Sequence, residues 1–404
     1  MSKGHLITGI DIGTSAIKVL TAIKKPEENK LEIVASVSVP SLGVRKGVVI
    51  NIEETAKSIR KAIEEAERIS NHKIKEAHCG LGGSHVFVTT SQGVVAVSRA
   101  DGIISREDIN RVMAAAQAFS IPQNKEILHT LPKEYIIDGE RGIKNALEMK
   151  GIRLEVQTLN LGGFTPYIKN LTQAVLGADV GITDLVISPL AAARAVLTPK
   201  QKELGVAVID IGAGTTGFAV FEEGELLHLT VIPVGSSHIT NDIAIGLKTD
   251  IETAERIKLE FGIATVQGTE KRDIIVLSES LGENLSFSRK ELAEIIEARL
   301  SEIFSFINQE LKNISRAQLL PAGIVLTGGG ASLPKIKDLA KKELKLPVRI
   351  GRPEEFVNAV EDPALSVCAG LVLWGYDSEI ENPPNFLKKG VSSKIKNIFK
   401  HFIP

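Results

Sequence analysis

Two short segments of this 404-residue chain combine an aspartate with glycines and hydroxyl side chains. Residues 8–19 read Thr-Gly-Ile-Asp-Ile-Gly-Thr-Ser-Ala-Ile-Lys-Val, and residues 208–220 read Val-Ile-Asp-Ile-Gly-Ala-Gly-Thr-Thr-Gly-Phe-Ala-Val. In each, small residues connect two apolar strands, which predicts a β-hairpin with glycine at its tip. Because Asp11 and Asp210 lie about half the chain apart, we expect two related halves that each open with this hairpin.

A hairpin tip of this composition is suited to holding phosphate. Glycine lets the backbone approach an anion closely, and consecutive N–H groups together with hydroxyls cradle phosphate oxygens. One such tip is more often an ordinary turn, whereas two facing tips can hold both sides of a phosphate chain. The residues expected in this cradle are Gly13, Thr14 and Ser15 in the first tip and Gly212, Gly214, Thr215 and Thr216 in the second.

The two aspartates and a nearby lysine supply the charges that such a site needs. Mg²⁺ in phosphate sites takes few carboxylates and completes its shell with water and phosphate oxygens. We therefore expect Asp11 and Asp210 to hold hydrated Mg²⁺ through water, and they are weak candidates for any catalytic role. Lys18 would neutralise phosphate as a mobile cation; the alternative is an exposed strand lysine.

A triple glycine follows a third apolar strand. Residues 324–336 read Ile-Val-Leu-Thr-Gly-Gly-Gly-Ala-Ser-Leu-Pro-Lys-Ile, a buried-type strand followed by glycines and a predicted helix. The missing side chains of Gly328, Gly329 and Gly330 leave room for a flat base or ribose against the backbone. A tight strand-to-helix turn would have the same sequence.

Composition limits the other classes of function. The 48 Lys and Arg residues balance 49 Asp and Glu residues, which argues against a general nucleic-acid binder. Cys79 and Cys368 are too few and too far apart for a disulfide framework or a cysteine metal site, so we expect a reducing cytoplasm. No stretch reaches about 18 uninterrupted apolar residues, so we expect no membrane span.

The C-terminal segment is basic and amphipathic. Residues 377–387 form a polar linker that contains Pro383-Pro384, and residues 388–404 carry no acidic side chain. An apolar stripe at helical spacing is formed by Ile395, Ile398, Phe399 and Phe402, and Lys394, Lys396 and Lys400 lie on the other side. This pattern predicts a helix that lies in an anionic membrane interface; the alternative is a terminal helix packed on its own domain.

Ile10–Lys18, Val208–Val220 and Ile324–Ile336 resemble, in order and spacing, the phosphate 1, phosphate 2 and adenosine motifs of the actin, Hsp70 and sugar-kinase superfamily. The chain is more closely similar to the FtsA family of bacterial cell-division proteins, through the region between the first predicted helix and residue 163, the Val231–Gly262 stretch and the tail. The resemblance implies an α/β, actin-like ATPase fold that binds ATP and Mg²⁺. Two duplicated halves would surround the nucleotide cleft, with an inserted α+β subdomain in the first half.

The resemblance also implies a division of the chain. The expected parts are a first core subdomain (1–83, 163–200 and 363–376), an inserted subdomain (84–162), a second core subdomain (201–245 and 318–362), an embedded subdomain (246–317), the linker (377–387) and the membrane-targeting helix (388–404).

Further site residues follow from the resemblance. Glu255 and Lys258 match superfamily positions that reach the adenosine, with solvated charges as the alternative. Relatives that transfer phosphate readily place Glu or Gln at the start of the first connecting helix, often as Glu-Pro, whereas this chain has Ser188-Pro189. Because serine is not a useful general base unaided, we expect at most slow ATP hydrolysis.

An FtsA-like protein would polymerise and tether filaments of the tubulin-like protein FtsZ to the cytoplasmic face of the membrane at the septum, beside other divisome proteins. Arg299 matches a basic position around the groove for the C-terminal peptide of FtsZ, and Lys290 matches one loosely. Two alternatives remain. A PilM-like pilus-assembly ATP-binding protein would lack the basic tail, and a small-molecule kinase would need a substrate base.

Overall fold

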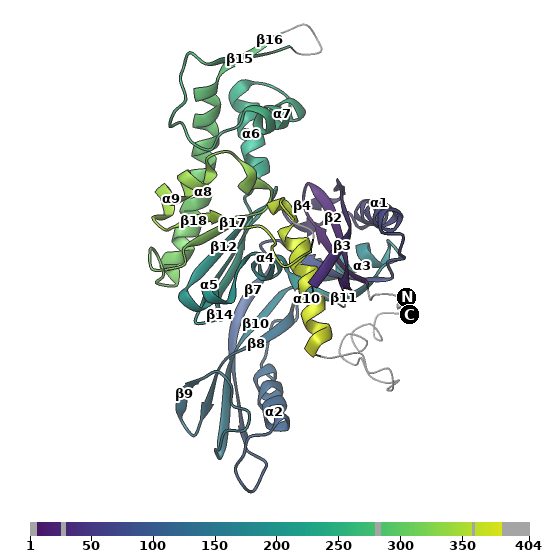
Figure 1. Cartoon of the computed structure of the whole chain (residues 1–404), viewed down its shortest axis with the longest axis vertical. Coiled ribbons are helices and arrows are strands. Elements are labelled where there is room, and N and C mark those ends of the chain that lie inside the picture. The colour runs from purple at the N-terminus through teal and green to yellow at the C-terminus, as the bar shows by residue number, and fades with distance from the viewer. Residues whose placement is uncertain (1–5, 26–29, 279–283, 358–359, 382–404) are drawn as a thin grey trace.

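The computed structural model describes residues 6–25, 30–278, 284–357 and 360–381, and two five-stranded sheets form its centre (Figure 1). The first sheet contains β1 (Leu6–Ile12), β2 (Ala16–Lys25), β3 (Lys30–Pro40), β6 (Glu76–Leu81) and β11 (Gly181–Ile187). The second contains β12 (Val206–Ile211), β13 (Thr216–Glu222), β14 (Glu225–Ile232), β17 (Ile324–Thr327) and β18 (Val348–Ile350).

The two sheets have the same topology. Their strand orders are β11-β6-β1-β2-β3 and β18-β17-β12-β13-β14. In each order, the last three strands pair antiparallel with one another. The first two strands run parallel to the third, which is β1 in one sheet and β12 in the other. The opening hairpins β1–β2 and β12–β13 occupy equivalent places, so the expected duplication is confirmed.

Helices connect and cover the strands of both sheets. The structure describes α1 (Ile52–Ser70), α3 (Thr165–Leu176), α4 (Ser188–Val196), α5 (Pro199–Leu204), α6 (Ser236–Leu247), α7 (Ile251–Phe261), α8 (Arg289–Asn313), α9 (Ile336–Leu344), α10 (Ser366–Glu381) and the short 3₁₀ turns η1 (Gly329–Ser332) and η2 (Pro363–Leu365). The helix α1 is capped by Asn51, whose side chain accepts a hydrogen bond from the Glu54 N–H.

The connecting helices α4 and α10 cross between the halves with almost no side chains between them. A Cβ atom on Gly370 of α10 would lie 1.8 Å from the carbonyl oxygen of Ala191 in α4. The neighbouring Ala192 and Ala369 are fully buried. The small residues of these two helices therefore set how closely the halves approach.

The inserted subdomain is a four-stranded sheet with one helix and a core of its own. It consists of β7 (Phe87–Ala96), α2 (Arg106–Gln117), β8 (Lys125–Ile137), β9 (Glu140–Ile143) and β10 (Arg153–Phe164), in strand order β7-β10-β8-β9. The helix α2 begins with a capping box, in which Ser105 and Asp108 are bonded reciprocally. The strand β7 is continuous, because its whole length pairs with β10.

The helices α6, α7 and α8 and the hairpin β15 (Ile274–Ser278)–β16 (Asn284–Ser288) extend the second half away from the inserted subdomain (Figure 1). Their buried residues share one apolar cluster with β12, β13 and β17. The helical and hairpin part of the second half is thus packed continuously onto its sheet.

The expected linker begins later than residue 377. Residues 377–381 belong to α10, because Asp377 is held by Arg194 of α4 at 2.6 Å and the Ser378 hydroxyl donates to the Trp374 carbonyl. The rest of the linker and the predicted membrane helix, with Ile395, Ile398, Phe399, Phe402 and their lysines, lie outside the described residues. Within the described ranges, none of the helices combines the length and apolar character that crossing a bilayer requires.

Candidate functional site

The tips of the two opening hairpins face each other across a cavity of about 70 Å³ at the junction of the halves. Each tip closes in the same way: the Gly13 N–H donates to the Ala16 carbonyl, and the Gly212 N–H donates to the Thr215 carbonyl. The cavity lining includes most of the expected residues: Asp11, Gly13, Thr14, Ser15, Lys18, Asp210, Gly212, Gly214, Thr215, Gly328 and Gly329.

The tips approach one another directly. A Cβ atom on Gly214 would lie 2.6 Å from the Thr14 hydroxyl oxygen, so only glycine fits between them without a shift. Thr216 does not line the cavity, because its buried hydroxyl donates to the Val234 carbonyl at 2.8 Å. The expected role of Thr216 in the cradle therefore has no geometric support, unlike that of Thr215.

A cluster of three charged groups lies inside the cavity. The Lys18 ammonium is 3.4 Å from an Asp11 carboxylate oxygen, and the two residues are direct partners in the β1–β2 register. Burial, with a contribution from Asp11, raises the pKa of Asp210 to about 7. Burial alone would lower the pKa of Lys18, but Asp11, Cys368 and Asp210 together hold it above its usual value. Lys18 is thus a half-buried, paired cation rather than an exposed strand lysine.

The charged cluster fits a hydrated divalent cation. Asp11 and Asp210 are the carboxylates of the lining, and the described residues contain no group of three or more His, Cys, Asp or Glu that could enclose a metal. Two carboxylates suit Mg²⁺ that takes its remaining ligands from water and phosphate. Burial first, and the neighbouring Asp11 carboxylate second, disfavour a negative charge on Asp210, which a nearby cation would stabilise.

The three glycines after β17 have different surroundings. Gly328, with a φ of +82°, would bring a Cβ atom within 2.3 Å of an Asp210 carboxylate oxygen. At Gly329 the nearest atom to an added Cβ is 3.9 Å away, so a side chain there would project into open space. Gly330 does not line the cavity, and a Cβ atom on it would lie 2.4 Å from the Ile211 side chain. Gly329 is therefore the position where a flat group has room against bare backbone.

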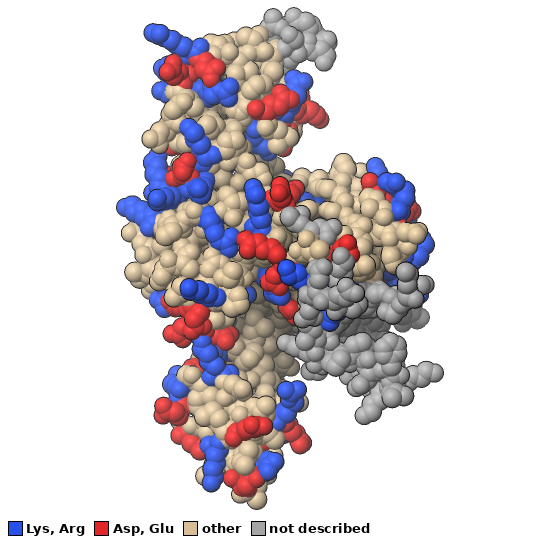
Figure 2. Space-filling model, in the orientation of Figure 1, with Lys and Arg blue, Asp and Glu red and all other residues tan. Residues whose placement is uncertain are grey.

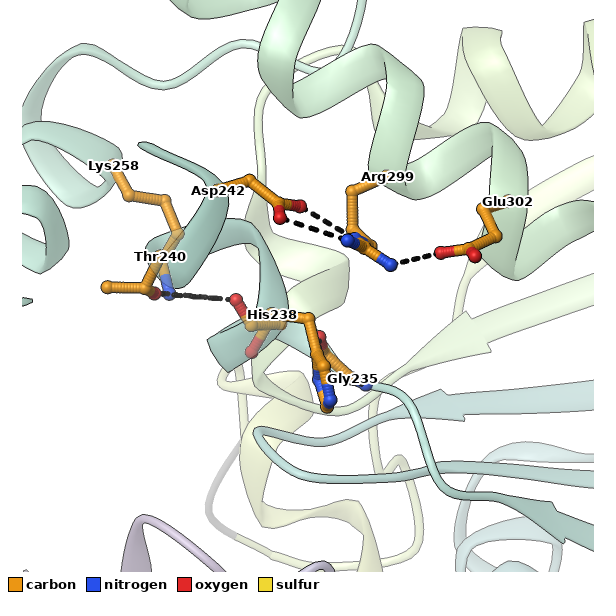
Figure 3. A network of polar contacts seen from close by, with 8 residues as sticks. Gly235, His238, Thr240, Asp242, Lys258, Arg299 and Glu302 are labelled. Atoms are coloured by element: carbon orange, nitrogen blue, oxygen red, sulfur yellow. Dashed lines mark hydrogen bonds and ion pairs between the residues drawn. The ribbon is translucent and has the colours of Figure 1, made fainter. Parts of the chain in front are cut away.

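Glu255 and Lys258 lie on α7 outside the cavity lining. The Lys258 ammonium contacts the Thr240 hydroxyl at 2.8 Å and Glu255 at 2.7 Å, as Figure 3 shows for Lys258 and Thr240. The Lys258 side chain is only 7% exposed, so the alternative of solvated charges is wrong for this residue. In this arrangement the pair holds α7 to α6.

The start of α6 braces the second hairpin tip, which the sequence analysis did not find. The Ser236 N–H donates to the Gly212 carbonyl at 2.8 Å, and the Ser237 N–H and hydroxyl both bond to the Ala213 carbonyl. A Cβ atom on Gly235 would lie 2.5 Å from the Gly212 oxygen. The sequence Gly-Ser-Ser between a strand and a helical pattern is typical of a helix start and could have indicated this contact.

A short turn also borders the cavity. It connects β4 (Val44–Arg45) to β5 (Val48–Val49), and its Gly47 lines the cavity and donates its N–H to the Thr14 hydroxyl at 2.9 Å. Gly82, which follows β6, lines the cavity as well. The sequence indication of this turn was Lys46-Gly47, which lies between two short strands.

Ser188 begins α4 and lines the cavity, as expected for the start of the first connecting helix. Arg299 lies elsewhere, on α8, where it forms a bidentate ion pair with Asp242 of α6 at 2.6 and 2.9 Å (Figure 3). It also contacts Glu302. Lys290 is one α-helical turn from Glu294, at 3.9 Å. The structure thus separates the proposed peptide site from the cavity.

The duplicated sheets, the facing tips and the inserted subdomain define an actin-like ATPase fold. Solved structures agree: a PilM–PilN type IV pilus biogenesis complex matches with a TM-score of 0.64, 19% identity and coverage of 91% of this chain and 98% of that chain. MreB5 of Spiroplasma citri bound to ADP matches with a TM-score of 0.55 and 14% identity, over 94% and 99% of the two chains.

The chain belongs to the FtsA family of cell-division proteins. It is 36% identical to cell division protein FtsA of Pseudomonas aeruginosa, over 94% of this chain and 91% of the relative. The corresponding protein of Borreliella burgdorferi is 40% identical, over 97% and 95%. A family model described as "Cell division protein FtsA" matches residues 207–370, and one described as "SHS2 domain inserted in FTSA" matches residues 83–161.

The raised pKa of Asp210 predicts a pH-dependent stability for the nucleotide-free protein. The folded pKa is about 7 and the unfolded value is about 4, so between these values the folded chain keeps a proton that the unfolded chain has lost. The free energy of unfolding should therefore fall, relative to Asp210→Asn, by up to about 1 kcal/mol per pH unit as pH rises. Denaturant titrations of both proteins from about pH 4 to pH 7 measure this difference. A difference that is constant across the range would contradict the assignment.

Proposed function

We propose that this protein binds ATP·Mg²⁺ in the cleft between its halves, polymerises, and tethers FtsZ filaments to the cytoplasmic face of the membrane at the division septum. One observation carries the proposal: two equivalent glycine tips face one cavity with Asp11 and Asp210 inside it, in a chain of the FtsA family. Family membership favours this function over pilus assembly and over phosphate transfer to a small molecule.

The nucleotide part of the proposal assigns a task to each wall of the cavity. The backbone N–H groups and hydroxyls of the two tips would bind the phosphates. Asp11 and Asp210 would hold hydrated Mg²⁺, which supplies charge neutralisation, and Gly329 would receive the base or ribose. The ADP-bound MreB5 structure supports nucleotide binding by this fold.

Hydrolysis is proposed to be slow. Ser188 stands at the start of α4, and the described residues of the lining include no Glu, Gln or His. A positioned acid or base is typically worth about 10²–10⁴-fold in rate. Without one, bound ATP would act chiefly as a ligand that favours one cleft conformation.

Membrane attachment is proposed from the sequence of the tail. On the face shown in Figure 2, basic and acidic side chains are interspersed over the folded part. The lysines of residues 388–404 would therefore supply the attraction to anionic lipid, at about 1 kcal/mol each. A single tail would bind reversibly, because a helix of this length is marginal in water. A polymer presents many tails at once, so its avidity is much higher.

The nucleotide assignment predicts the effect of two substitutions. Gly329→Val places a branched side chain in the cavity, and Asp210→Ala removes a carboxylate that would face the metal. Each should weaken Mg·ATP binding by about tenfold or more in calorimetry. Asp338→Ala, a change of an exposed aspartate on α9, is the matched control and should bind like the wild type. Unchanged ATP affinity in both cavity variants would remove the site assignment.

The peptide assignment predicts opposite effects at the two ends of one ion pair. Arg299→Glu should weaken binding of a labelled C-terminal FtsZ peptide about tenfold or more, because the basic partner of acidic peptide side chains is reversed. Asp242→Asn removes the bidentate partner of Arg299 and leaves only its contact with Glu302, so peptide binding should be equal or tighter. Fluorescence anisotropy, with thermal unfolding as a folding check, measures both. If Asp242→Asn weakens binding as much as Arg299→Glu, then Arg299 only holds α6 to α8.

The tail assignment predicts a position-specific loss of membrane binding. Phe399→Glu and Asn397→Glu add the same charge, but only Phe399 belongs to the apolar stripe. Phe399→Glu should lower partitioning onto anionic liposomes about tenfold more than Asn397→Glu, since partial burial of phenylalanine is also lost. Sedimentation with liposomes of matched composition gives both values. Equal losses would mean that charge alone binds the tail and that no amphipathic helix forms.

A further inference from the structure

The turn between β4 and β5 lies against both hairpin tips at once. The Gly47 N–H donates to the hydroxyl of Thr14 in the first tip at 2.9 Å. On the other side, a Cβ atom on Gly214 of the second tip would lie 3.1 Å from the Cα of Lys46. Lys46 is thus the lysine whose backbone the structure places between the two phosphate-binding tips.

The position of this turn is fixed from behind by other backbone segments. A Cβ atom on Gly47 would lie 2.7 Å from the Gly83 nitrogen, so the turn packs directly on the strand exit that leads into the inserted subdomain. At the base of the hairpin, the N–H groups of Ile50 and Asn51 both donate to the Gly43 carbonyl, and Asn51 then caps α1. The Lys46 backbone is therefore held at a defined place beside the cavity.

The turn and the triple glycine lie against different parts of the cavity. A Cβ atom on Gly328 would meet Asp210, and the nearest atom to a Cβ on Gly329 would belong to Ala364. The turn instead contacts the hairpin tips, where the phosphates are proposed to bind. If the base lies on Gly329, the turn is at the phosphate end of the nucleotide.

With a bound triphosphate, the cavity would contain more negative charge than its lining can neutralise. Among the described lining residues, Lys18 is the basic one, and it is already paired with Asp11. Hydrated Mg²⁺ offsets part of the charge of a triphosphate, and the remainder is unmatched by the lining. The Lys46 side chain is exposed, and in the described part of the chain no ion pair engages it. Its ammonium is a compact charge on a flexible stem, which suits capture of a terminal phosphate.

We propose that Lys46 is a further nucleotide-binding residue, which contacts the terminal phosphate of ATP and makes the β4–β5 turn distinguish ATP from ADP. This inference rests on the proposed ATP site. A positive φ does not by itself mark the residue, because Lys248, Lys335 and Lys345 also adopt it, at helix caps. The contacts of the turn with Thr14 and Gly214 distinguish it from those caps.

The test uses the full chain and compares Mg·ATP with Mg·ADP in calorimetry. Lys46→Asn removes the ammonium but keeps a residue that adopts positive φ readily, so the turn and the melting temperature should be preserved. ATP affinity should fall about tenfold or more while ADP affinity changes less than about twofold. Lys46→Arg should retain most of the ATP preference.

Two controls separate a direct contact from general effects. Lys345→Asn makes the same change at a left-handed lysine at the C-terminal cap of α9, and should alter neither affinity. Arg45→Gln removes a neighbouring exposed charge from the same hairpin, and should change ATP affinity by less than about twofold.

The outcomes are distinct. Loss of ATP preference in Lys46→Asn alone supports the inference. Equal weakening of ATP and ADP, an unchanged ATP preference, or an equal effect of Arg45→Gln would each overturn it while leaving the ATP site intact. If the wild-type protein binds neither nucleotide, the proposed ATP function itself is wrong.

Discussion

The close crossing of α4 and α10 is the contact on which the rest of the structure depends. Gly370 meets the Ala191 carbonyl with no room for a Cβ atom, and a Cβ on Gly9 of β1 would lie 2.6 Å from the Cys368 carbonyl in α10. These backbone contacts bring β1 and β12 near enough for their hairpin tips to face one cavity. A larger residue at the crossing would separate the tips, since well-packed interiors do not absorb even one methyl group without movement.

The close approach concentrates charge as well as backbone. Asp11, Lys18 and Asp210 lie together in a space of low dielectric constant. The raised pKa of Asp210 shows that ionising this carboxyl there has a free-energy cost. A bound cation would relieve that cost, so ligand binding and folding stability are linked through the same group. The shape of the cavity is maintained by packing around it, in particular by α6 behind the second tip and by the β4–β5 turn beside the first.

Local patterns were sufficient to predict the features that are encoded locally. The two hairpins depend on residues within a few positions of each other, and both are present. The repeated aspartate-glycine motif was enough to predict the duplication, because the two copies form equivalent strands. Most of the cavity lining follows from these elements.

Other features depend on residues distant in sequence and were not predictable from a pattern. The helical state of residues 377–381 reflects the ion pair of Asp377 with Arg194, and β7 is continuous because β10 pairs along its whole length. Likewise, nothing in the α8 sequence reveals that Arg299 is neutralised by Asp242 of α6. The bracing of the second tip by α6 depends on serines that any helix start can carry.

The helices α6 to α8 and the inserted subdomain are attached to the two central sheets in different ways. The attachment determines how a change in the cleft would move each of them. The helices α6 to α8 share a continuous apolar core with the second sheet, so a shift of the second tip carries Arg299 and Asp242 with it as one packed unit. The inserted subdomain has a core of its own, but the base of its sheet also packs on the first half, since Leu159 and Leu161 of β10 belong to the main core. A part with a separate core can bend where it joins its neighbour, whereas a shared core cannot be sheared without loss of packing. Nucleotide would therefore act on the proposed peptide site by moving it rigidly, and on the inserted subdomain through the packed base of its sheet as well as through the β4–β5 turn.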